Sequence, residues 1–562
     1  MIAEYSTAPR FPRLAVFILL FCAHAYSAWS QDLGAIGSSD PIRAGGSVSA
    51  RTVMYSASEI RGRRQPFSWV LNGTVNVSLY DVDMPFSFTF SEQERSFAQP
   101  FNQFGVSPRY QWATGHFGYR NLTFSPYTLS GHQMLGAGFE LNPGIVRAGF
   151  MYGRFQRAVE EDTAASRFVQ PAYERSGFAG KIGVGSGSEF IDLIFLKAKD
   201  DPASLRSAPR NSLVLPGENL VLGFTGGATL FGGLRVTLDA AASDYTRDVR
   251  AMSIETSNNT HLDAFDALID QRGSSQFYTA VRGGLAWNAQ RWGVGFNYAR
   301  IDPDYQSMGA YYVGSDIESF SLAPRFILWN GAVRVNANVT QRYDNLQNKK
   351  AATTSRLLPM VNVSVQPAPH YGIDVQYSDV LTSQSAGRKP LSDTTRLDSS
   401  TPMLTVAPRY SILGTDGTHT FLANVTYQTL NDHNTFSSRY SEYSTTNMHL
   451  AYSLSLPKLH WSFTLSGNAT QMRNAAGTFR NSGFSLGAGK SLLEQALRLN
   501  GSFGMSFHAA GETMTSTIAG TYSVQRRHNF SAQIAHVSSN AGYYAQKTFS
   551  EITLVLGYAY TF

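Results

Sequence analysis

The sequence is almost without cysteine. The one cysteine, Cys22, ends a short apolar run that begins at Leu14 and follows Arg10 and Arg13, which is the pattern of a secretory signal peptide. Phe21 is bulky at a position where a lipoprotein signal takes a small residue, so we expect Cys22 to be removed with the leader. The mature chain would then have no thiol, which excludes disulfides, cysteine nucleophiles and thiolate metal sites.

Long apolar runs and charged residues are scarce as well. After the leader, no uninterrupted apolar run reaches the roughly 20 residues that a membrane-spanning helix needs. Charged residues make up 15% of the 562 residues, against about 25% in a typical soluble protein. The net charge of +6 is too weak to indicate a nucleic-acid partner. Any membrane crossing must therefore be made by strands, whose lipid-facing positions exclude charge.

Motifs for catalysis are missing. Gly489-Lys490-Ser491 lacks the glycine that a phosphate-binding loop needs at position 484, and no Gly-x-Ser-x-Gly stands at a strand-to-helix turn. The twelve histidines are scattered, and acidic pairs such as Asp302 and Asp304 are interpreted as solvated loop charges. We predict that the chain is not an enzyme and uses no cofactor and no metal.

A two-residue period is the strongest pattern that the sequence does contain. From Ile552 to the end, even-numbered positions are apolar or aromatic and odd-numbered positions are small or polar. One apolar and one polar face suit a barrel wall between lipid and a wet interior. Tyr558, Tyr560 and Phe562 suit a membrane–water interface, and we predict that they form the signal read by the outer-membrane barrel assembly machinery. The alternative is the edge strand of a soluble β-sandwich.

The connections between alternating segments are sorted by length. Short turns alternate with long polar loops at 160–174, 202–218, 249–275, 303–317 and 383–401, as in bacterial barrels. The short turns lie at 142–144, 185–188, 231–233, 288–290, 329–331, 367–370, 414–418, 457–459 and 525–528. The fold class is therefore all-β, a transmembrane antiparallel β-barrel of about 22 strands, within a range of 20–24. Its first strand, at 110–124, is expected to pair with the last, at 549–562.

Three parts of the chain are expected. Residues 1–30 form the signal peptide, cleaved after Ser30 or after Ala25. Residues 31–109 form a plug-like lumen segment or a periplasmic segment that contains a β-hairpin, although the hairpin could instead supply the first two wall strands. Residues 110–562 form the barrel.

The polar parity of the barrel strands is expected to face the lumen. Arg334, Asn336, Asn338 and Arg342 share one face of a single predicted strand. The complete set of lumen-facing candidates is Arg147, Asp192, Arg334, Asn336, Asn338, Arg342, Asp374 and Arg498. These side chains would either tune the selectivity of a water-filled lumen or neutralise one another and the N-terminal segment.

Residues 86–155 carry a resemblance to known proteins. The motifs Gln99-Pro-Phe-Asn-Gln-Phe-Gly105 and Gly118-Tyr-Arg-Asn-Leu-Thr-Phe-Ser-Pro-Tyr resemble uncharacterised outer-membrane β-barrel proteins of the Bacteroidota type. In outline the chain is also similar to porins and to TonB-dependent transporters with a reduced plug. The resemblance implies a Gram-negative outer-membrane location and a barrel fold, and it implies no catalytic residues.

These patterns favour a channel or transporter for small solutes, gated by the N-terminal segment, with outer-membrane lipid as its surroundings. The alternative is a scaffold, secretion or surface-anchoring component of an outer-membrane complex. In that case residues 97–104 and loop 249–275 would contact a periplasmic or secretion-system partner.

Overall fold

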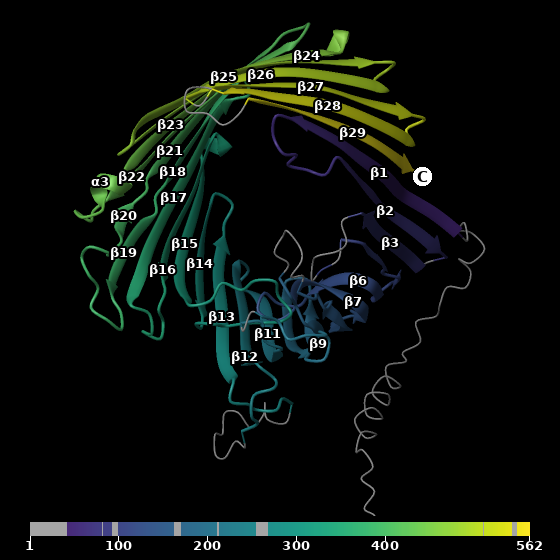
Figure 1. Cartoon of the computed structure of the whole chain (residues 1–562), viewed down its shortest axis with the longest axis vertical. Helices are drawn as coiled ribbons and strands as arrows, with labels where there is room; N and C mark the ends of the chain where they lie inside the picture. The colour runs from purple at the N-terminus through teal and green to yellow at the C-terminus, as the bar shows by residue number, and fades with distance from the viewer. Residues whose placement is uncertain are drawn as a thin grey trace, which may run out of the picture.

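The computed structural model is an antiparallel β-barrel with almost no helix, as Figure 1 shows. It describes residues 42–80, 82–92, 99, 101–161, 170–210, 213–254, 268–509, 511–541 and 548–562. Within these residues, 29 strands belong to one sheet. Three pairs of short strands, β4 with β5, β18 with β19 and β20 with β21, each share one position in the wall. The closed ring therefore has 26 strands.

The first half of the wall consists of β1 (Ile42–Ser58), β2 (Phe67–Leu79), β3 (Val82–Ser91), β4 (Gln103–Val106), β5 (Arg109–Tyr110), β6 (Ala113–Thr123), β7 (Ser130–Leu141), β8 (Val146–Gln156), β9 (Glu174–Ser186), β10 (Glu189–Asp201), β11 (Glu218–Leu230), β12 (Leu234–Thr246), β13 (Ser275–Asn288) and β14 (Trp292–Ile301).

The second half consists of β15 (Ile317–Leu328), β16 (Val333–Tyr343), β17 (Ala352–Ala368), β18 (Tyr371–Ser378), β19 (Leu381–Ala386), β20 (Asp398–Ser400), β21 (Met403–Leu413), β22 (Thr418–Asp432), β23 (Tyr443–Leu456), β24 (Trp461–Asn474), β25 (Gly477–Leu492), β26 (Leu497–His508), β27 (Gly511–Val524), β28 (His528–Ala541) and β29 (Phe549–Thr561). Single turns of helix occur at η2 (Trp329–Gly331), α3 (Ser438–Ser441) and η3 (Pro457–Leu459). No described helix is long and apolar enough to cross a membrane.

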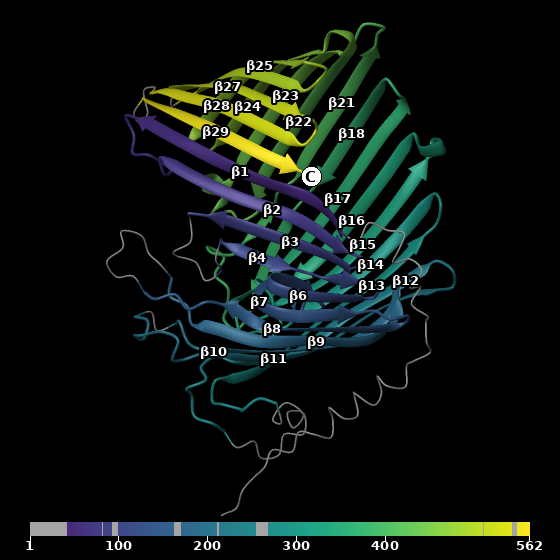
Figure 2. The ribbon, with the colours of Figure 1, turned by 90° about the vertical axis from the view of Figure 1, so that its right-hand side faces the viewer.

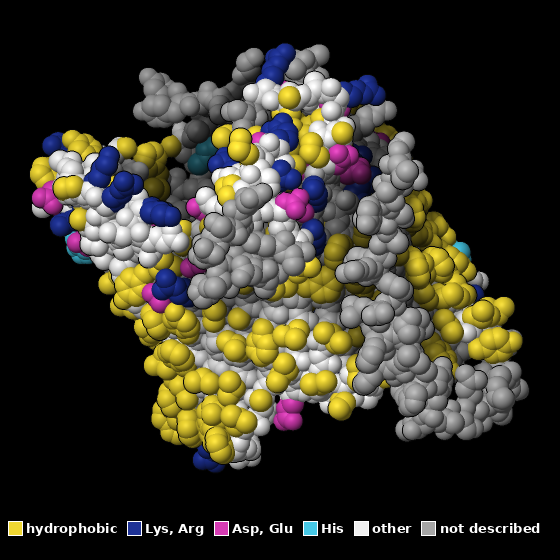
Figure 3. Space-filling model, turned by 90° about the horizontal axis from the view of Figure 1, so that it is seen from below, with side chains coloured by type: hydrophobic (Ala, Val, Ile, Leu, Met, Phe, Trp, Pro, Cys, Tyr) yellow, Lys and Arg dark blue, Asp and Glu magenta, His cyan; other side chains and the backbone are white. Residues whose placement is uncertain are grey.

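The two faces of the wall follow the two-residue period of the sequence. On the outer face, Ile182, Leu193 and Ile518 are 65%, 58% and 70% exposed. Figure 3 shows such side chains as an apolar belt, with basic and acidic side chains gathered beyond one edge of it. A soluble protein rarely exposes so much contiguous apolar surface, whereas a barrel in lipid requires it.

The connections are sorted by length between the two ends of the barrel. One end carries the short turns that the sequence predicts, and all nine are present. At Gly144 and Gly232 the backbone has φ of +61° and +72°, a left-handed conformation that glycine adopts without strain. The opposite end carries the long loops, whose described parts include 157–161, 170–173, 202–210, 247–254, 268–274 and 302–316. β1 begins and β29 ends at the short-turn end, because Ser47 pairs with Thr561.

The expected number of strands was too low. From β6 onward the ring contains the expected 22 wall strands, and the other positions are filled by β1, β2, β3 and the β4–β5 pair. The strands described between residues 42 and 110 are therefore wall rather than a plug or periplasmic segment. The hairpin of β2 and β3 is indeed wall, which was the alternative interpretation. The proposed leader at 1–30 lies outside the described residues.

The expected closing pair was also wrong. β29 pairs with β1 along its length rather than with β6, and Figure 2 shows the two strands side by side. On the outer face of β1, the residues opposite β29 include Val48, Ala50 and Thr52, which are small and only weakly apolar. They sit opposite the large Tyr560, Tyr558 and Leu556. The large apolar side chains at this closing pair therefore come mainly from β29. The sequence of β1, taken alone, resembles a polar coil.

A pair of engineered cysteines tests this seam. Gly46 and Phe562 exchange two backbone hydrogen bonds of 3.0 and 3.1 Å, so Ser49 and Ala559 form a non-hydrogen-bonded pair, with Cα atoms about 4.5 Å apart. That separation suits a disulfide. We expect S49C/A559C to cross-link on mild oxidation, measured as a mobility shift on a non-reducing gel. The mismatched control S49C/Y560C points its two thiols to opposite faces and should not cross-link.

Candidate solute path through the lumen

One side of the lumen is filled by apolar side chains. Residues of the lumen face of β6 to β14 join the segments 124–129 and 302–316 in one buried cluster. Leu196, Val221 and Phe155 in this cluster have no exposed surface. On this side the lumen is therefore a packed core along the part of the strands that segment 302–316 covers.

The segment 302–316, between β14 and β15, folds inward and is fastened to the wall. The sequence predicts an ordinary long polar loop here, so the inward fold is a departure from that prediction. Its backbone pairs with β7 through Ser130 N–H, which donates to Gly309 O at 2.9 Å. Further bonds are donated by Tyr305 Oη to Tyr127 O (2.6 Å), Ser307 Oγ to Thr128 O (2.6 Å), Met308 N to Asn219 Oδ1 (2.9 Å) and Ser243 Oγ to Gln306 O (2.7 Å).

Two details show how closely this segment fits. A Cβ atom on Gly309 would lie 2.2 Å from Leu196 Cδ1 and 2.7 Å from the carbonyl oxygen of Thr128, so only glycine allows this approach. Desolvation by burial raises the pKa of the Tyr305 phenol, which keeps its proton on the hydrogen bond to Tyr127. The segment is a fixed part of the lumen wall.

Two ion pairs hold buried carboxylates in the filled half. Arg147 on β8 donates two hydrogen bonds to Asp192 on β10, at 2.8 and 3.0 Å, across Gly183 of the intervening β9. Arg175 makes the same two-pronged contact with Asp200, at 2.8 and 3.1 Å. Both carboxylates are buried. The candidates Arg147 and Asp192 thus neutralise each other.

Removing Arg147 should destabilise the barrel. The change R147A leaves the Asp192 carboxylate, which is 2% exposed, without its cation. Breaking one partner of a buried ion pair costs about 3–5 kcal/mol. We expect a lower urea midpoint of unfolding, followed by tryptophan fluorescence. R334A is the matched control, since Arg334 makes no salt bridge to a described residue, and an equal loss of stability in both variants would contradict the assignment.

The open half of the lumen has a polar wall. The pairing register puts Arg334, Asn336, Asn338 and Arg342 on the lumen face of β16, opposite the exposed outer-face residue Val339. Asn338 Oδ1 accepts a hydrogen bond of 2.8 Å from Ser321 Oγ on β15. These four residues line the same side, as their common parity predicts.

The remaining two candidates lie elsewhere on that wall. Asp374 on β18 faces Arg409 on β21, with Nη1 to Oδ2 at 3.9 Å. Arg498 lies on the lumen face of β26, opposite Ser491 and Thr521. The lumen side of β14 to β17 carries no described carboxylate within the strands.

Several lumen residues escaped the sequence reasoning. Arg235, Arg325, Arg356 and Arg409 lie on the lumen face by register. The alternation of apolar and polar residues in their strands indicates that these arginines face the lumen. In β15 and β17, however, prolines interrupt this alternation and make the two-residue period hard to recognise. The sequence also contains an indication of the filled half. From Phe190 to Ala198, both the odd-numbered and the even-numbered residues are apolar, apart from Asp192 and Lys197, as expected of a strand that is buried on both faces.

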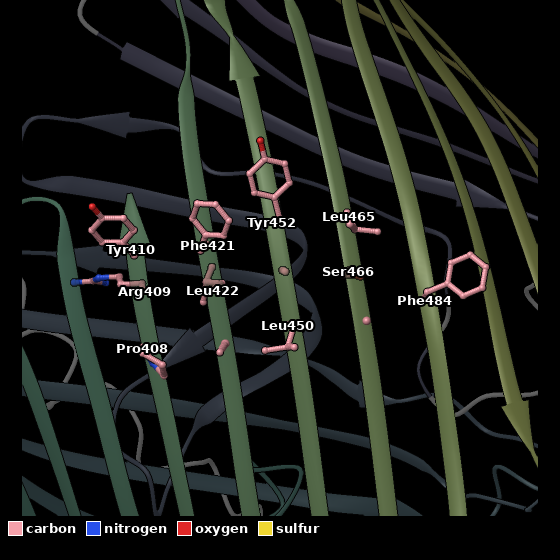
Figure 4. Close-up of a pocket in the computed structure, with 13 residues that line it drawn as sticks. Pro408, Arg409, Tyr410, Phe421, Leu422, Leu450, Tyr452, Leu465, Ser466 and Phe484 are labelled. Carbon is pink, nitrogen blue, oxygen red and sulfur yellow. The ribbon is translucent and has the colours of Figure 1, made fainter. Parts of the chain in front are cut away.

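A groove of about 600 Å³ lies on the opposite, outer face of the wall, across β21 to β25 (Figure 4). It forms where Ala423 and Gly467 stand between larger neighbours. Phe421 and Tyr452 flank it with ring centroids 5.0 Å apart. Because the groove belongs to the apolar belt of the outer face, it does not line the lumen.

The comparisons with known proteins give only distant likenesses. No protein-family model and no curated protein sequence matches the chain, so the resemblance to Bacteroidota-type barrels stays a prediction. The chain is similar to the anion-selective porin from Comamonas acidovorans, with 10% identity, a TM-score of 0.27 and coverage of 66% of this chain and 93% of that one.

Two more solved structures are similar at the same low level. The P pilus usher translocation pore has 9% identity and a TM-score of 0.38, with coverage of 93% of this chain and 100% of that one. Pseudomonas aeruginosa OccK2 in complex with glucuronate has 10% identity and a TM-score of 0.29, with coverage of 92% and 98%. Such scores identify neither a solute nor a partner.

Proposed function

We propose that the chain is an outer-membrane channel for small polar solutes, and that solutes pass along the unfilled side of the lumen. The observation that carries this proposal is the contrast between the two halves. Toward the long-loop end of β6 to β14, the lumen face is largely apolar and is buried against segment 302–316. On β15 to β17 it presents Arg334, Asn336 and Arg356 as exposed side chains. A ring of 26 strands encloses more space than side chains can fill, so a polar, exposed lumen face implies water beside it.

The outer surface supports a place in the membrane. The aromatic side chains Tyr558, Tyr560 and Phe530 lie near the short-turn end of the outer face, where a membrane–water interface would hold them. Charged outer-face side chains such as Lys199 and Glu218, 3.4 Å apart, lie at the long-loop end. This arrangement is the one expected if the long loops face the exterior and the short turns face the periplasm.

Gating by the N-terminal segment is not part of the proposal. The strands β1, β2 and β3 belong to the wall, so they cannot move as a plug without opening the ring. The fastened segment 302–316 instead acts as a fixed constriction.

Single-channel recording in planar lipid bilayers tests the channel. Purified, folded protein should give stepwise conductance, and uncharged polymers of increasing size should define the width of the path. A folded protein, shown by a heat-dependent shift on a gel, that inserts into the bilayer without any conductance would refute the proposal.

A further inference from the structure

The lumen face carries an excess of arginine at its short-turn end. Each of these arginines lies within five residues of a short turn: Arg235 on β12, Arg325 on β15, Arg334 on β16, Arg409 on β21 and Arg498 on β26. We refer to these five residues as the arginine collar. Arg325 and Arg334 are diagonal neighbours across β15 and β16, with Cα atoms about 7–8 Å apart.

The collar is mostly unneutralised. Arg235, Arg325, Arg334 and Arg498 form no salt bridge and no side-chain hydrogen bond with any residue that the structure describes. Arg409 is the exception, since its Nη2 donates to Gln366 Oε1 at 3.0 Å and its Nη1 lies 3.9 Å from Asp374. Like charges placed side by side on a sheet destabilise it, so nothing in the fold itself favours this arrangement.

The described carboxylates near this end of the lumen are engaged elsewhere. Asp192 is held by both nitrogens of Arg147. Asp83 accepts a hydrogen bond of 2.5 Å from Ser78 and lies opposite Arg109 in the sheet. Apart from Asp374 with Arg409, these paired charges belong to the packed half and its flank, and the free guanidinium groups belong mainly to the open half.

Glycines on neighbouring strands make room for the guanidinium groups. A Cβ atom on Gly293 would lie 2.6 Å from Arg325 Nε, and one on Gly372 would lie 2.8 Å from Arg409 Nε. Gly227 lies diagonally across from Arg235, and a Cβ atom there would meet Arg235 Nη2 at an ordinary contact distance of 3.8 Å. Arg325 and Arg409 therefore lie flat along the wall, over a neighbour that has no side chain, and leave the opening beside them clear.

We propose that the arginine collar makes the channel selective for anions and binds solutes that carry carboxylate or phosphate groups. This inference rests on the proposed channel. Guanidinium groups bind both kinds of oxyanion through paired N–H donors and keep their charge at any physiological pH. Charge of one sign in a narrow, low-dielectric opening raises the local concentration of counter-ions.

Reversal potentials in a KCl gradient test the selectivity. We expect the unchanged protein to pass chloride in preference to potassium. The variant R325Q/R334Q/R498Q should lower the chloride-to-potassium permeability ratio by about tenfold, the lower end of what a focused field supplies. The effect should be strong at 0.1 M salt and weak at 1 M, because the screening length falls from about 10 Å to about 3 Å.

The matched control is R291Q/R526Q/R527Q, which removes three arginines from turns at the same end of the barrel. It should keep the anion preference. Tripolyphosphate added on the short-turn side should reduce the current of the unchanged protein and of this control, and should reduce that of the collar variant much less.

A second variant, G293A, keeps every charge but displaces Arg325, and should weaken the tripolyphosphate effect without changing the folded fraction. If the collar and control variants had equal permeability ratios and normal conductance, the inference that the arginine collar selects anions would be wrong, while the proposed channel would stand. Absence of conductance in every variant would overturn the channel and with it this inference.

Discussion

Replacing residues 302–316 with a short turn is expected to raise the single-channel conductance at least about twofold, because the conductance of a pore follows its open cross-section. The replacement is geometrically feasible, since Ile301 and Ile317 lie directly opposite each other at the ends of β14 and β15. The segment now covers the lumen face of β10 to β12, where Met308 and Gly309 contact Asn219 and Leu196. Its removal exposes that wall to water and widens the path.

The control for this experiment is a similar shortening of loop 387–397. In the described part of the chain, a side chain of another loop, that of Asn434, contacts this loop. Its Nδ2 donates hydrogen bonds to Asp393 O and Arg396 O at 2.8 and 2.7 Å. This variant should conduct as the unchanged protein does. A single substitution, G309V, gives an independent measure, since a side chain there would have to push the segment off Leu196. If removal of 302–316 left conductance and polymer exclusion unchanged, the segment would not constrict the path.

Deleting residues 42–58 is expected to abolish the folded barrel. Without β1, β2 would have to close the ring against β29, and those two strands run parallel because β1 is antiparallel to both. An odd ring of 25 strands therefore cannot close by antiparallel pairing, and the unpaired backbone groups of two edges would each cost several kcal/mol in lipid. On a gel, the heat-dependent shift of the folded form should disappear.

Because an antiparallel ring needs an even number of strands, a second deletion provides a stringent control. Deleting residues 42–79 removes both β1 and β2, so that β3 meets β29 in the antiparallel sense and an even ring of 24 strands is again possible. We expect this larger deletion to recover part of the folded form that the smaller one loses. If residues 42–58 were instead a plug, the smaller deletion would leave a folded barrel with a larger conductance, and that result would contradict the assignment of β1.

The sequence predicted those parts of the fold where one face of a strand is strongly apolar. The even-numbered residues from Ile552 to Phe562 define β29, and the short turns at 142–144 and 329–331 were found because glycine and proline interrupt the period. β1 was missed because its lipid-facing residues are small, so its place depends on the aromatic partner strand rather than on its own pattern. β4 and β5 were missed because Pro108 and their short length break the alternation.

For the site, parity predicts orientation but cannot predict pairing. Arg147 and Arg334 occupy similar positions in the sequence pattern. In the structure, Arg147 forms an ion pair with the buried Asp192, whereas the side chain of Arg334 is exposed. The difference depends on whether a carboxylate stands at the matching height two strands away, which follows from the register of the whole ring. The inward fold of 302–316 depends likewise on Asn219 and Ser243, more than 50 residues upstream.

The seam between β1 and β29 also has a consequence for the order of events in biogenesis. Its two strands are roughly 500 residues apart in the sequence, whereas almost every other wall contact joins neighbours in the chain. Hairpins can therefore form as soon as their strands are available, but the ring can be sealed only after β29, the last strand of the wall, is also available. Until then β1 is an open edge to which a second copy could add its own β29, so the yield of monomer should depend on how well that edge is shielded during assembly.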